Sequence, residues 1–398
     1  MKILAIDDQQ LVLLPLKRRL SELGYEVQTE TDALKAKAIF DNFQPDLVIV
    51  DINMPVISGI EIIRYIRGTQ KSQTPIMVLS GNTDDNLIVE SFDLGVEDYM
   101  KKPLSLDEVS ARVKRLIGAT SNQKEVSKNT IIQKRCVGVV IPCYNEEDRL
   151  SSKEFTDFVE KHSGYHLCFV NDGSKDNTLH ILKELRKGRE DYITVYDCEQ
   201  NGGKAEAVRL GMLHMANYTD LDYIGFLDAD LSTDLTDFDD LVKTIETSNF
   251  KIVSGSRISR MGANIAKESA RQIISLTINY IIRKILKMNF KDTQCGAKIM
   301  DKEVIKIAFE ERFLTKWLFD VEIFMRIKKH FGAEKADGLI CEQPLKRWIH
   351  ADGSKLSMKD SAKIVFQLGH IAIHYNQQKK IKPNKNFNYA IEPEKVNG

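Results

Sequence analysis

Residues 1–118 alternate between strand-like and helix-like patterns five times, and this repetition strongly limits the possible folds. Short apolar runs occur at Ile3–Ile6, Val27, Leu47–Val50, Ile76–Leu79 and Asp98–Met100. Patterns with helical spacing lie between them, such as Ala33–Phe40 and Ile60–Ile66. This order predicts an α/β domain in which helices cover a parallel sheet. In such folds the functional residues lie at the C-terminal ends of the strands.

Polar residues follow four of these apolar runs, where the strands are expected to end. They are Asp7 and Asp8 after the first run, Asp51 after the third, Ser80 after the fourth and Lys102 after the fifth. Three carboxylates that converge on one edge of a sheet repel one another, and a divalent cation relieves this repulsion. A lysine beside them can pair with a phosphoryl oxygen. The pattern therefore indicates a pocket for a cation and a phosphoryl group.

This part of the chain resembles the receiver domain of two-component response regulators, which has a flavodoxin-like fold. The resemblance rests on the Asp-Ile-Asn-Met-Pro-x-x-x-Gly run at 51–59 and on Tyr99-Met-Lys-Lys-Pro103. It implies that Asp51 accepts a phosphoryl group from a sensor histidine kinase or a phosphotransfer protein. It also implies roles for the neighbouring residues: Mg²⁺ binding by Asp7, Asp8 and Asp51, phosphoryl binding by Ser80, charge neutralisation by Lys102 and conformational switching by Tyr99.

Three further points concern this domain and the residues that follow it. A degenerate receiver that serves only for dimerisation is the alternative to an active one. Lys102 is assigned to the pocket because it directly precedes Pro103, and Lys101 is expected to be solvated. Residues 119–135 are mostly polar and form either a flexible linker or a continuation of the last receiver helix.

A second α/β domain is expected over residues 136–380, and its most informative feature is the apolar run Ile224–Leu227 followed by Asp228 and Asp230. In an extended segment, positions i and i+2 point to the same side. Two carboxylates placed in this way suit Mg²⁺ or Mn²⁺, and these ions usually hold substrate phosphates. An Asp-x-Asp motif alone is a weak signal, because exposed loops produce it by chance.

Three upstream motifs strengthen this signal. The strand-like run Val137–Ile141 leads into Pro142-Cys-Tyr-Asn-Glu146, and Leu167–Val170 leads into Asn171-Asp172-Gly-Ser174. The third motif, Asn201-Gly-Gly-Lys204, predicts a glycine turn that opens a helix, whose N-terminal NH groups attract phosphate. Lys204 can then stabilise a diphosphate leaving group; the alternative is a plain turn with a solvated lysine.

Together these motifs look like the nucleotide-sugar half of a family-two glycosyltransferase with a GT-A, Rossmann-like fold. The resemblance implies a single-displacement, inverting transfer in which Asp228, Asp230 and Lys204 serve the donor diphosphate and its metal. It also implies that the base and ribose of the donor are bound by Pro142, Tyr144, Glu146 and Asp172. For Asp172, capping of a helix is the alternative.

Four later blocks narrow the resemblance to the dolichyl- or polyprenyl-phosphate hexosyltransferases, especially the glucosyl branch. They are Ser254-Gly-Ser-Arg257, Asp292-Thr-Gln-Cys-Gly-Ala-Lys298, Phe319-Asp-Val-Glu322 and Arg347-Trp-x-x-x-x-Gly-Ser-Lys-Leu356. This branch implies a UDP-sugar donor, with a GDP-sugar as second choice. It also implies a lipid-phosphate acceptor, for which Arg257, Lys298 and Lys355 are the candidate ligands. If the acceptor is instead a hydroxyl, Asp320 is the candidate base.

Composition excludes several other classes of protein. Lys plus Arg equals Asp plus Glu at 57 each, so no basic footprint indicates nucleic acid. No apolar run reaches the roughly 18 residues of a membrane span, and no signal peptide is evident. The six cysteines form no Cys-x-x-Cys pair, which favours reduced core residues in a cytoplasmic protein. Residues 381–398 are polar, and we expect a disordered tail there.

The sequence therefore predicts a phosphorylation-regulated, metal-dependent glycosyltransferase that acts as a homodimer. The alternative is a signalling or scaffold protein whose transferase half only binds a nucleotide-sugar or a partner. The segment 273–290, rich in Ile and Leu with Arg283, Lys284 and Lys287, is either a membrane-interface helix or a helix packed on the sheet or on a second subunit. The first choice would place the protein peripherally on the inner face of the membrane.

Overall fold

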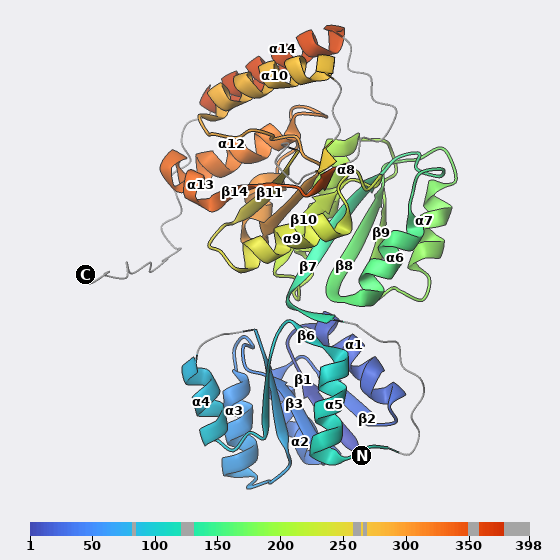
Figure 1. The fold of residues 1–398 in the computed structure, drawn as a ribbon, viewed down its shortest axis with the longest axis vertical. Coiled ribbons are helices and arrows are strands. Elements are labelled where there is room, and N and C mark those ends of the chain that lie inside the picture. Colours follow the sequence, from blue (N-terminus) through green and yellow to red (C-terminus); the bar gives the residue numbers. More distant parts are fainter. Residues whose placement is uncertain (82–84, 121–130, 258–263, 266–268, 349–357, 378–398) are drawn as a thin grey trace, which may run out of the picture.

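The computed structural model describes residues 1–81, 85–120, 131–257, 264–265, 269–348 and 358–377. Two sheets, each with helices packed against it, lie end to end along the long axis of the molecule (Figure 1). The first sheet belongs to the N-terminal domain and the second to the C-terminal domain. Lys355 and the expected tail at 381–398 lie outside the described residues.

The N-terminal domain has five parallel strands in the order β2-β1-β3-β4-β5. The strands are β1 (Lys2–Ile6), β2 (Glu26–Glu30), β3 (Leu47–Asp51), β4 (Ile76–Ser80) and β5 (Asp98–Lys101). The helices are α1 (Gln10–Glu22), α2 (Ala33–Phe43), α3 (Gly59–Arg64) with a π-helical turn at Tyr65–Thr69, α4 (Asp85–Asp93) and α5 (Leu106–Ile117). The inner strands β3 and β4 are buried on both faces, which explains their continuous apolar runs.

The C-terminal domain is built on a mixed sheet with the order β14-β11-β13-β10-β7-β8-β9. Its strands are β7 (Ile131–Cys143), β8 (His162–Asn171), β9 (Ile193–Asp197), β10 (Tyr223–Leu227), β11 (Ile252–Ser256), β13 (Ala297–Asp301) and β14 (Ile340–Pro344). Strand β13 runs antiparallel between β10 and β11. The pairs β10–β7, β7–β8 and β8–β9 are all parallel. A separate pair consists of β12 (Asn264–Ile265) and β15 (Arg347–Trp348).

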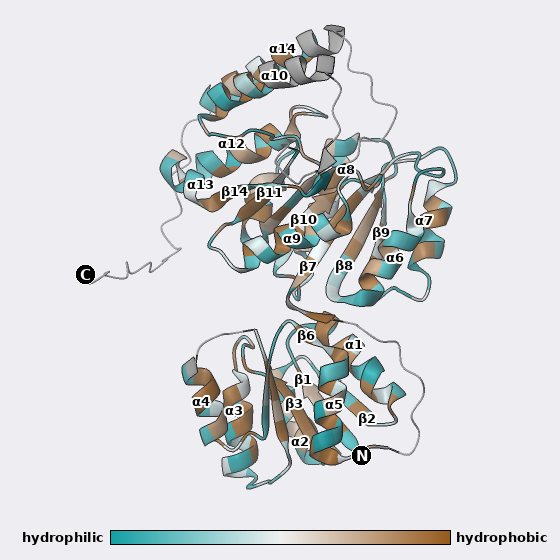
Figure 2. Cartoon of the chain, viewed as in Figure 1, coloured by the Kyte–Doolittle hydropathy of each residue, from teal (hydrophilic) through white to brown (hydrophobic). Residues whose placement is uncertain are grey.

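Helices cover both faces of this second sheet, and the strands between them are strongly apolar (Figure 2). The helices are α6 (Ser152–Lys161), α7 (Thr178–Arg186), α8 (Lys204–Ala216), α9 (Leu235–Glu246), α10 (Ser269–Leu286), a 3₁₀ turn at Lys302–Val304, α11 (Ile305–Phe309), α12 (Phe319–Phe331), α13 (Ala333–Leu339) and α14 (Met358–Gln377). The parallel strands β7, β8 and β10 all point their carboxyl ends away from the N-terminal domain (Figure 1).

The two domains are in direct contact. Leu104–Ser105 forms a short strand, β6, just after the last strand of the first sheet, and it pairs antiparallel with Ile131–Ile132 of β7. Helix α1 packs against β7 and β8, so that buried side chains of both domains form one continuous apolar cluster. The prediction that 119–135 is all linker is therefore wrong at its end, because 131–135 already belong to strand β7.

Helices α10 and α14 lie side by side at the far end of the molecule from the N-terminal domain (Figure 1). Helix α10 buries Ile278, Ile282 and Leu286, and it also contacts α12. The predicted apolar segment 273–290 is thus a packed helix over most of its length, with a basic outer face at Arg283 and Lys284. Among the described residues, no helix combines the length and the apolar character that crossing a membrane requires.

Candidate active site and phosphorylation site

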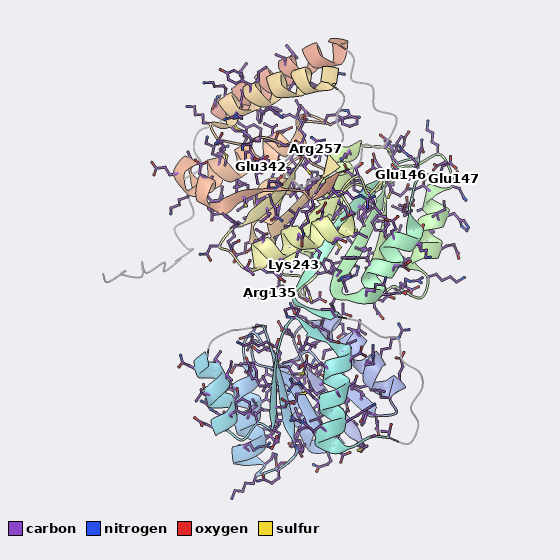
Figure 3. All side chains as sticks on the ribbon, in the orientation of Figure 1. Arg135, Glu146, Glu147, Lys243, Arg257 and Glu342 are labelled. Carbon is purple, nitrogen blue, oxygen red and sulfur yellow. The ribbon has the colours of Figure 1, made fainter. Side chains whose placement is uncertain are left out.

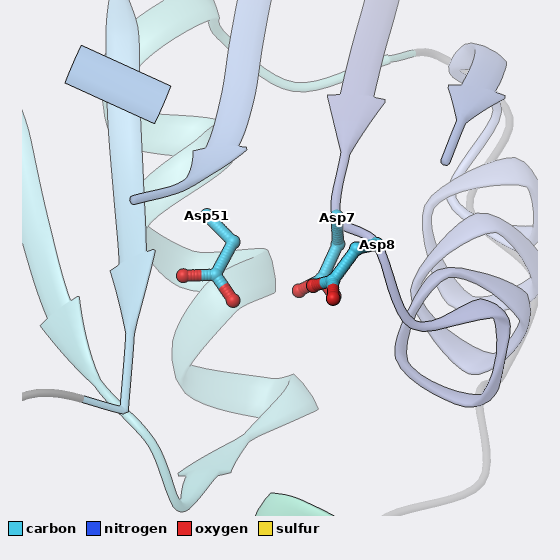
Figure 4. Close-up of side chains that lie close together, drawn as sticks. All are labelled: Asp7, Asp8 and Asp51. Carbon is cyan, nitrogen blue, oxygen red and sulfur yellow. The ribbon is translucent and has the colours of Figure 1, made fainter. Parts of the chain in front are cut away.

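The carboxylates of Asp7, Asp8 and Asp51 meet at the carboxyl ends of β1 and β3 (Figure 4). One oxygen from each lies within 4.8 Å of the others. Asp7 and Asp51 are buried, and burial together with the charge of Asp51 raises the pKa of Asp8 to about 6. A cluster of hard oxygen donors that repel one another fits a Mg²⁺ ion, which these residues would hold.

Lys102 supplies the only positive charge that ion-pairs with this cluster among the described residues. Its ammonium lies 2.6 Å from an Asp7 oxygen and 2.9 Å from an Asp51 oxygen. Burial lowers the pKa of Lys102, but the two carboxylates outweigh burial and raise it above the ordinary value. Lys101 is exposed instead, in agreement with the assignment made from sequence.

The other predicted members of this pocket lie on adjacent strand ends. Ser80 is completely buried, and its hydroxyl accepts a hydrogen bond of 3.0 Å from the Asn53 amide. The Asn53 backbone NH donates to Asp51 over 3.0 Å. The ring of Tyr99 on β5 lies 6.5 Å from that of Phe92 on α4, and its buried hydroxyl has no hydrogen-bond partner among the described residues.

Burial raises the pKa of Asp7 to about 7 and that of Asp8 to about 6, which predicts pH-dependent metal binding. Below about pH 6, Asp8 is protonated, so that Mg²⁺ must displace a proton to bind. We expect the affinity for Mg²⁺ to weaken as the pH falls through about 6, and calorimetric titration of Mg²⁺ at several pH values measures this. Asp8→Asn is the matched variant, because it removes the titration of Asp8 and leaves that of Asp7, so we expect a shallower pH dependence. An equally steep pH dependence in that variant would show that another group is responsible.

The second site lies at the carboxyl end of β10, where Asp228 and Asp230 follow the strand. The Lys204 ammonium, at the first residue of α8, lies 2.5 Å from Asp228 Oδ1. Burial lowers the pKa of Lys204, but Asp228 outweighs it and raises this pKa above its ordinary value. Asp230 is exposed, and its Oδ1 accepts a hydrogen bond of 2.9 Å from the Ser232 NH. Two carboxylates beside one ammonium form a donor set that fits a divalent ion and a diphosphate.

Gly296 shapes this site, although it was assigned no role of its own within the Asp292–Lys298 block. Strand β13 pairs with β10 so that Ala297 lies opposite Leu227, which brings Gly296 against the Asp228 carboxylate. A Cβ atom added to Gly296 would lie 2.0 Å from Asp228 Oδ2. The glycine in the Asp-Thr-Gln-Cys-Gly block therefore provides the space that Asp228 occupies.

Gly296→Ala is expected to lower transferase activity by about 10²-fold, because misplacement of a reacting group by about 1 Å has that effect. The Asp228 carboxylate must move to admit the methyl group. Initial rates with saturating donor, together with thermal unfolding, test this expectation. Gly338→Ala is the matched control, since nothing lies within 4 Å of the added Cβ. A full rate in Gly296→Ala would mean that the position of Asp228 is not critical.

Asp172, predicted to bind the donor nucleoside, makes two contacts with backbone NH groups in this structure. Its carboxylate accepts hydrogen bonds from the NH groups of Gly202 over 2.7 Å and Gly203 over 2.9 Å. Asp172 thereby orders the glycine turn that leads into α8 and Lys204. These contacts agree with the capping role of Asp172, and binding of the nucleoside by its carboxylate stays a prediction.

The loop after β7 carries the other predicted nucleoside ligands. Tyr144 is 41% exposed, and Glu146 accepts a hydrogen bond of 3.1 Å from Arg149. Burial raises the pKa of Glu146, as do the nearby charges of Asp230 and Asp228. Pro142 is half-buried and lies one residue before the end of β7 at the buried Cys143. Glu146 and Arg257 lie at the end of the sheet that is remote from the N-terminal domain, whereas Arg135 lies beside that domain (Figure 3).

The three predicted acceptor ligands differ in their surroundings. Arg257 is held by Asp292, with Nε to Oδ2 at 2.7 Å and Nη2 to Oδ1 at 2.8 Å. Burial would raise the pKa of Asp292, but Arg257 holds it at about 2. Lys355 lies outside the described residues.

Lys298 is fully buried, which does not fit the predicted contact with an acceptor. Its ammonium donates to Asp320 over 2.6 Å and to the Cys295 carbonyl over 2.7 Å. Asp320 is also buried, so this ion pair keeps both side chains away from an incoming substrate. Burial raises the pKa of Asp320, although Lys298 opposes the shift. The charges of Lys204 and Asp228 both act on Asp320, so the buried pair lies close to the donor site.

The fold places a receiver-like domain before a glycosyltransferase-like domain, and comparison with known proteins agrees. Residues 3–114 match the response regulator receiver domain, and residues 138–308 match glycosyl transferase family 2. The chain is 31% identical over 234 residues to dolichyl-phosphate β-glucosyltransferase of Dictyostelium discoideum, covering 55% of this chain and 68% of that protein. The enzyme of the same name from Saccharomyces cerevisiae is 31% identical over 264 residues, covering 60% and 75%.

The N-terminal part has relatives of its own. Response regulator MprA of a Mycobacterium species is 37% identical over 120 residues, covering 30% of this chain and 52% of that protein. The chain belongs to glycosyl transferase family 2, as a relative of the dolichyl-phosphate β-glucosyltransferases, and carries a response-regulator receiver domain before its transferase domain. The predicted fold class, a flavodoxin-like receiver followed by a GT-A transferase, is confirmed.

Proposed function

We propose that this protein transfers a hexose from a nucleotide-sugar, with UDP-sugar favoured, to a polyprenyl phosphate or another membrane-associated acceptor. The transfer is a single displacement with inversion, and the receiver domain controls it. The observation that carries this proposal is the grouping of Lys204, Asp228 and Asp230 where α8 begins and β10 ends. This is the place where a helix N-terminus and a lysine can receive a diphosphate.

The residues of this site have different roles in the transfer of the sugar. A divalent ion, Mg²⁺ or Mn²⁺, held by Asp228 and Asp230 would supply charge neutralisation at the diphosphate. Lys204 stabilises the negative charge that grows on the leaving group as the bond to the sugar breaks. A lipid phosphate is already anionic and needs no strong base to attack. This fits the burial of Asp320 in its ion pair with Lys298.

The acceptor is proposed to reach the site from a membrane surface. Helices α10 and α14 expose large apolar side chains, with Tyr280 60%, Phe366 79% and Ile373 57% exposed. Basic residues Arg283 and Lys284 are exposed on the same helix pair. Apolar and basic side chains together favour binding at the interface of an anionic bilayer. The relatives act on dolichyl phosphate according to their names, which supports an isoprenoid acceptor.

Receiver control is proposed to pass through the contact between the domains. The Gln9 amide, next to Asp7 and Asp8, donates to Asp222 Oδ2 over 2.6 Å. Asp222 precedes β10, which carries Asp228 at its other end, and it also accepts from the Cys136 NH of β7 over 2.9 Å. The charge of Asp222 acts on Asp8 as well. Metal binding or phosphorylation in the receiver therefore acts on the ends of two strands that lead to the donor site.

A second route for control is a change in assembly state. Phosphorylation by a sensor histidine kinase or a phosphotransfer protein adds roughly −1.5 to −2 charge at the strand ends. Reorientation of Ser80 and Tyr99 would then alter the outer face of the receiver and favour a homodimer. Light scattering of the protein with and without beryllofluoride measures this, and an unchanged mass would leave the domain contact as the route.

The deciding experiment offers UDP- and GDP-sugars with polyprenyl phosphate in anionic vesicles and detects the glycolipid by mass spectrometry. Omitting Mg²⁺ and Mn²⁺ tests the metal requirement. Binding of a nucleotide-sugar without transfer to any acceptor would favour the alternative, a signalling or scaffold protein. Full activity on a soluble acceptor without vesicle binding would overturn the membrane part of the proposal.

A further inference from the structure

The segment between α11 and α12 lies beside the glycine turn of the donor site. It carries Lys316, a lysine outside all of the sequence motifs. The Lys316 side chain runs over the glycine turn, with its Cδ 3.2 Å from the place where a Cβ on Gly203 would lie. Burial raises the pKa of Asp172, and the charge of Lys316 is among those that oppose the rise. The ammonium of Lys316 is therefore close to the turn that opens α8. The residue is exposed and forms no ion pair with any described residue.

A buried carboxylate fixes this segment. Glu322, on the first turn of α12, is completely buried. It accepts hydrogen bonds from the Leu314 NH over 2.9 Å, from the Thr315 NH over 3.0 Å and from the Thr315 hydroxyl over 3.0 Å. These bonds hold the two residues that directly precede Lys316.

A buried guanidinium fixes the start of the same segment. Arg326, one helical turn after Glu322, donates to the carbonyls of Ala308, Glu311 and Arg312 over 2.8 Å in each case. Its guanidinium also lies 4.4 Å from the centre of the Phe313 ring. Residues 308–315 are thus bonded to α12 along their length.

Helix α14 completes this arrangement through one hydroxyl. Tyr375 donates to Glu322 Oε2 over 3.1 Å and accepts from Arg326 Nε over 2.9 Å. Among the described side chains, Tyr375 is the one that bonds α14, the helix with the exposed Phe366 and Ile373, to Glu322 and Arg326. Loss of this hydroxyl leaves two buried charged groups with one partner fewer.

We propose that Lys316 binds the diphosphate of the nucleotide-sugar donor, and that Glu322, Arg326 and Tyr375 are positioning residues that hold Lys316 over the glycine turn. This inference rests on the proposed function and extends it to a second donor-binding lysine. The NH groups of Gly202 and Gly203 donate to Asp172 and are therefore not available to the diphosphate. A side-chain cation beside the turn would take over this role. Lys204 approaches the same place from the helix below.

The test measures binding of UDP-glucose and of UDP by calorimetry, together with steady-state kinetics. Lys316→Met is expected to raise the Kd of both ligands about tenfold, because one charge-assisted hydrogen bond is lost. Lys316→Arg keeps the charge and is expected to restore most of the affinity. Lys187→Met, at an exposed lysine that follows α7, is the matched control and is expected to bind like the unmodified protein.

The positioning role needs a readout that a loss of stability alone does not change. Tyr375→Phe is expected to raise the donor Kd and the KM severalfold. In a Lys316→Met background the same substitution is expected to have no further effect on donor Kd, because it acts through that lysine. An additive effect would overturn the positioning role. An unchanged donor Kd in Lys316→Met would overturn the inference alone, whereas no nucleotide binding by the unmodified protein would overturn the proposed function with it.

Discussion

Asp230→Ala is expected to lower the rate of sugar transfer by about 10²–10³-fold, the usual loss when one group that stabilises a transition-state charge is removed. Asp230 is exposed at the end of β10, and among the described residues its carboxylate accepts one hydrogen bond, from Ser232. The fold therefore depends little on it, and the loss should fall on metal and donor. Rates at saturating metal and the midpoint of thermal unfolding, measured side by side, separate the two effects.

Asp191→Ala is a suitable control for this experiment. Asp191 is exposed just before β9, at the opposite end of the sheet from the donor site. Its removal changes the net charge by the same amount without touching the site. Equal donor affinity with and without metal in the unmodified protein would contradict the role assigned to the Asp-x-Asp pair.

Asp51→Ala is expected to abolish phosphorylation of the receiver. With acetyl phosphate and Mg²⁺, the Asp51 carboxylate takes the phosphoryl group and acetate leaves. Intact-mass analysis should show one added phosphoryl group in the unmodified protein and none in the variant. Asp93→Ala, at an exposed carboxylate on α4, should be phosphorylated normally. Phosphorylation that persists in Asp51→Ala would show that another side chain is the acceptor.

The same variant tests the control of transfer. We expect phosphorylation to activate the transferase, so that acetyl phosphate raises the rate in the unmodified protein and leaves Asp51→Ala unaffected. Gln9→Ala should be phosphorylated but should respond less, because it removes the amide that contacts Asp222. A rate that does not change on phosphorylation would mean that the receiver serves another purpose, such as localisation.

Much of both sites could be predicted because the end of a buried strand has a recognisable local sequence pattern. An apolar run followed by Asp7-Asp8, by Asp51 or by Asp228-Ala-Asp230 shows where a strand stops and which side chains gather at its edge. Lys102 could be chosen over Lys101 from its place before Pro103, and its contacts with Asp7 and Asp51 agree with that choice.

The parts that could not be predicted depend on pairing between distant segments. Gly296 meets Asp228 only because β13 inserts antiparallel beside β10 in one particular register. The same register turns Lys298 inward over the Phe226 ring at 5.3 Å, which its neighbours in sequence do not indicate. The bond between Gln9 and Asp222 joins residues 213 positions apart. None of these contacts has a period or a local motif that reveals it.

Helix α1 is apolar almost all round at Leu11–Leu16, and this affects how the two domains unfold on heating. One side of the helix covers the receiver sheet and another covers β7 and β8 of the transferase. Separating the two domains would expose apolar surface that each of them shields from water on the other. The two domains are therefore expected to unfold in one cooperative transition. A phosphoryl group or Mg²⁺ bound to the receiver domain should then also raise the unfolding temperature of the transferase domain.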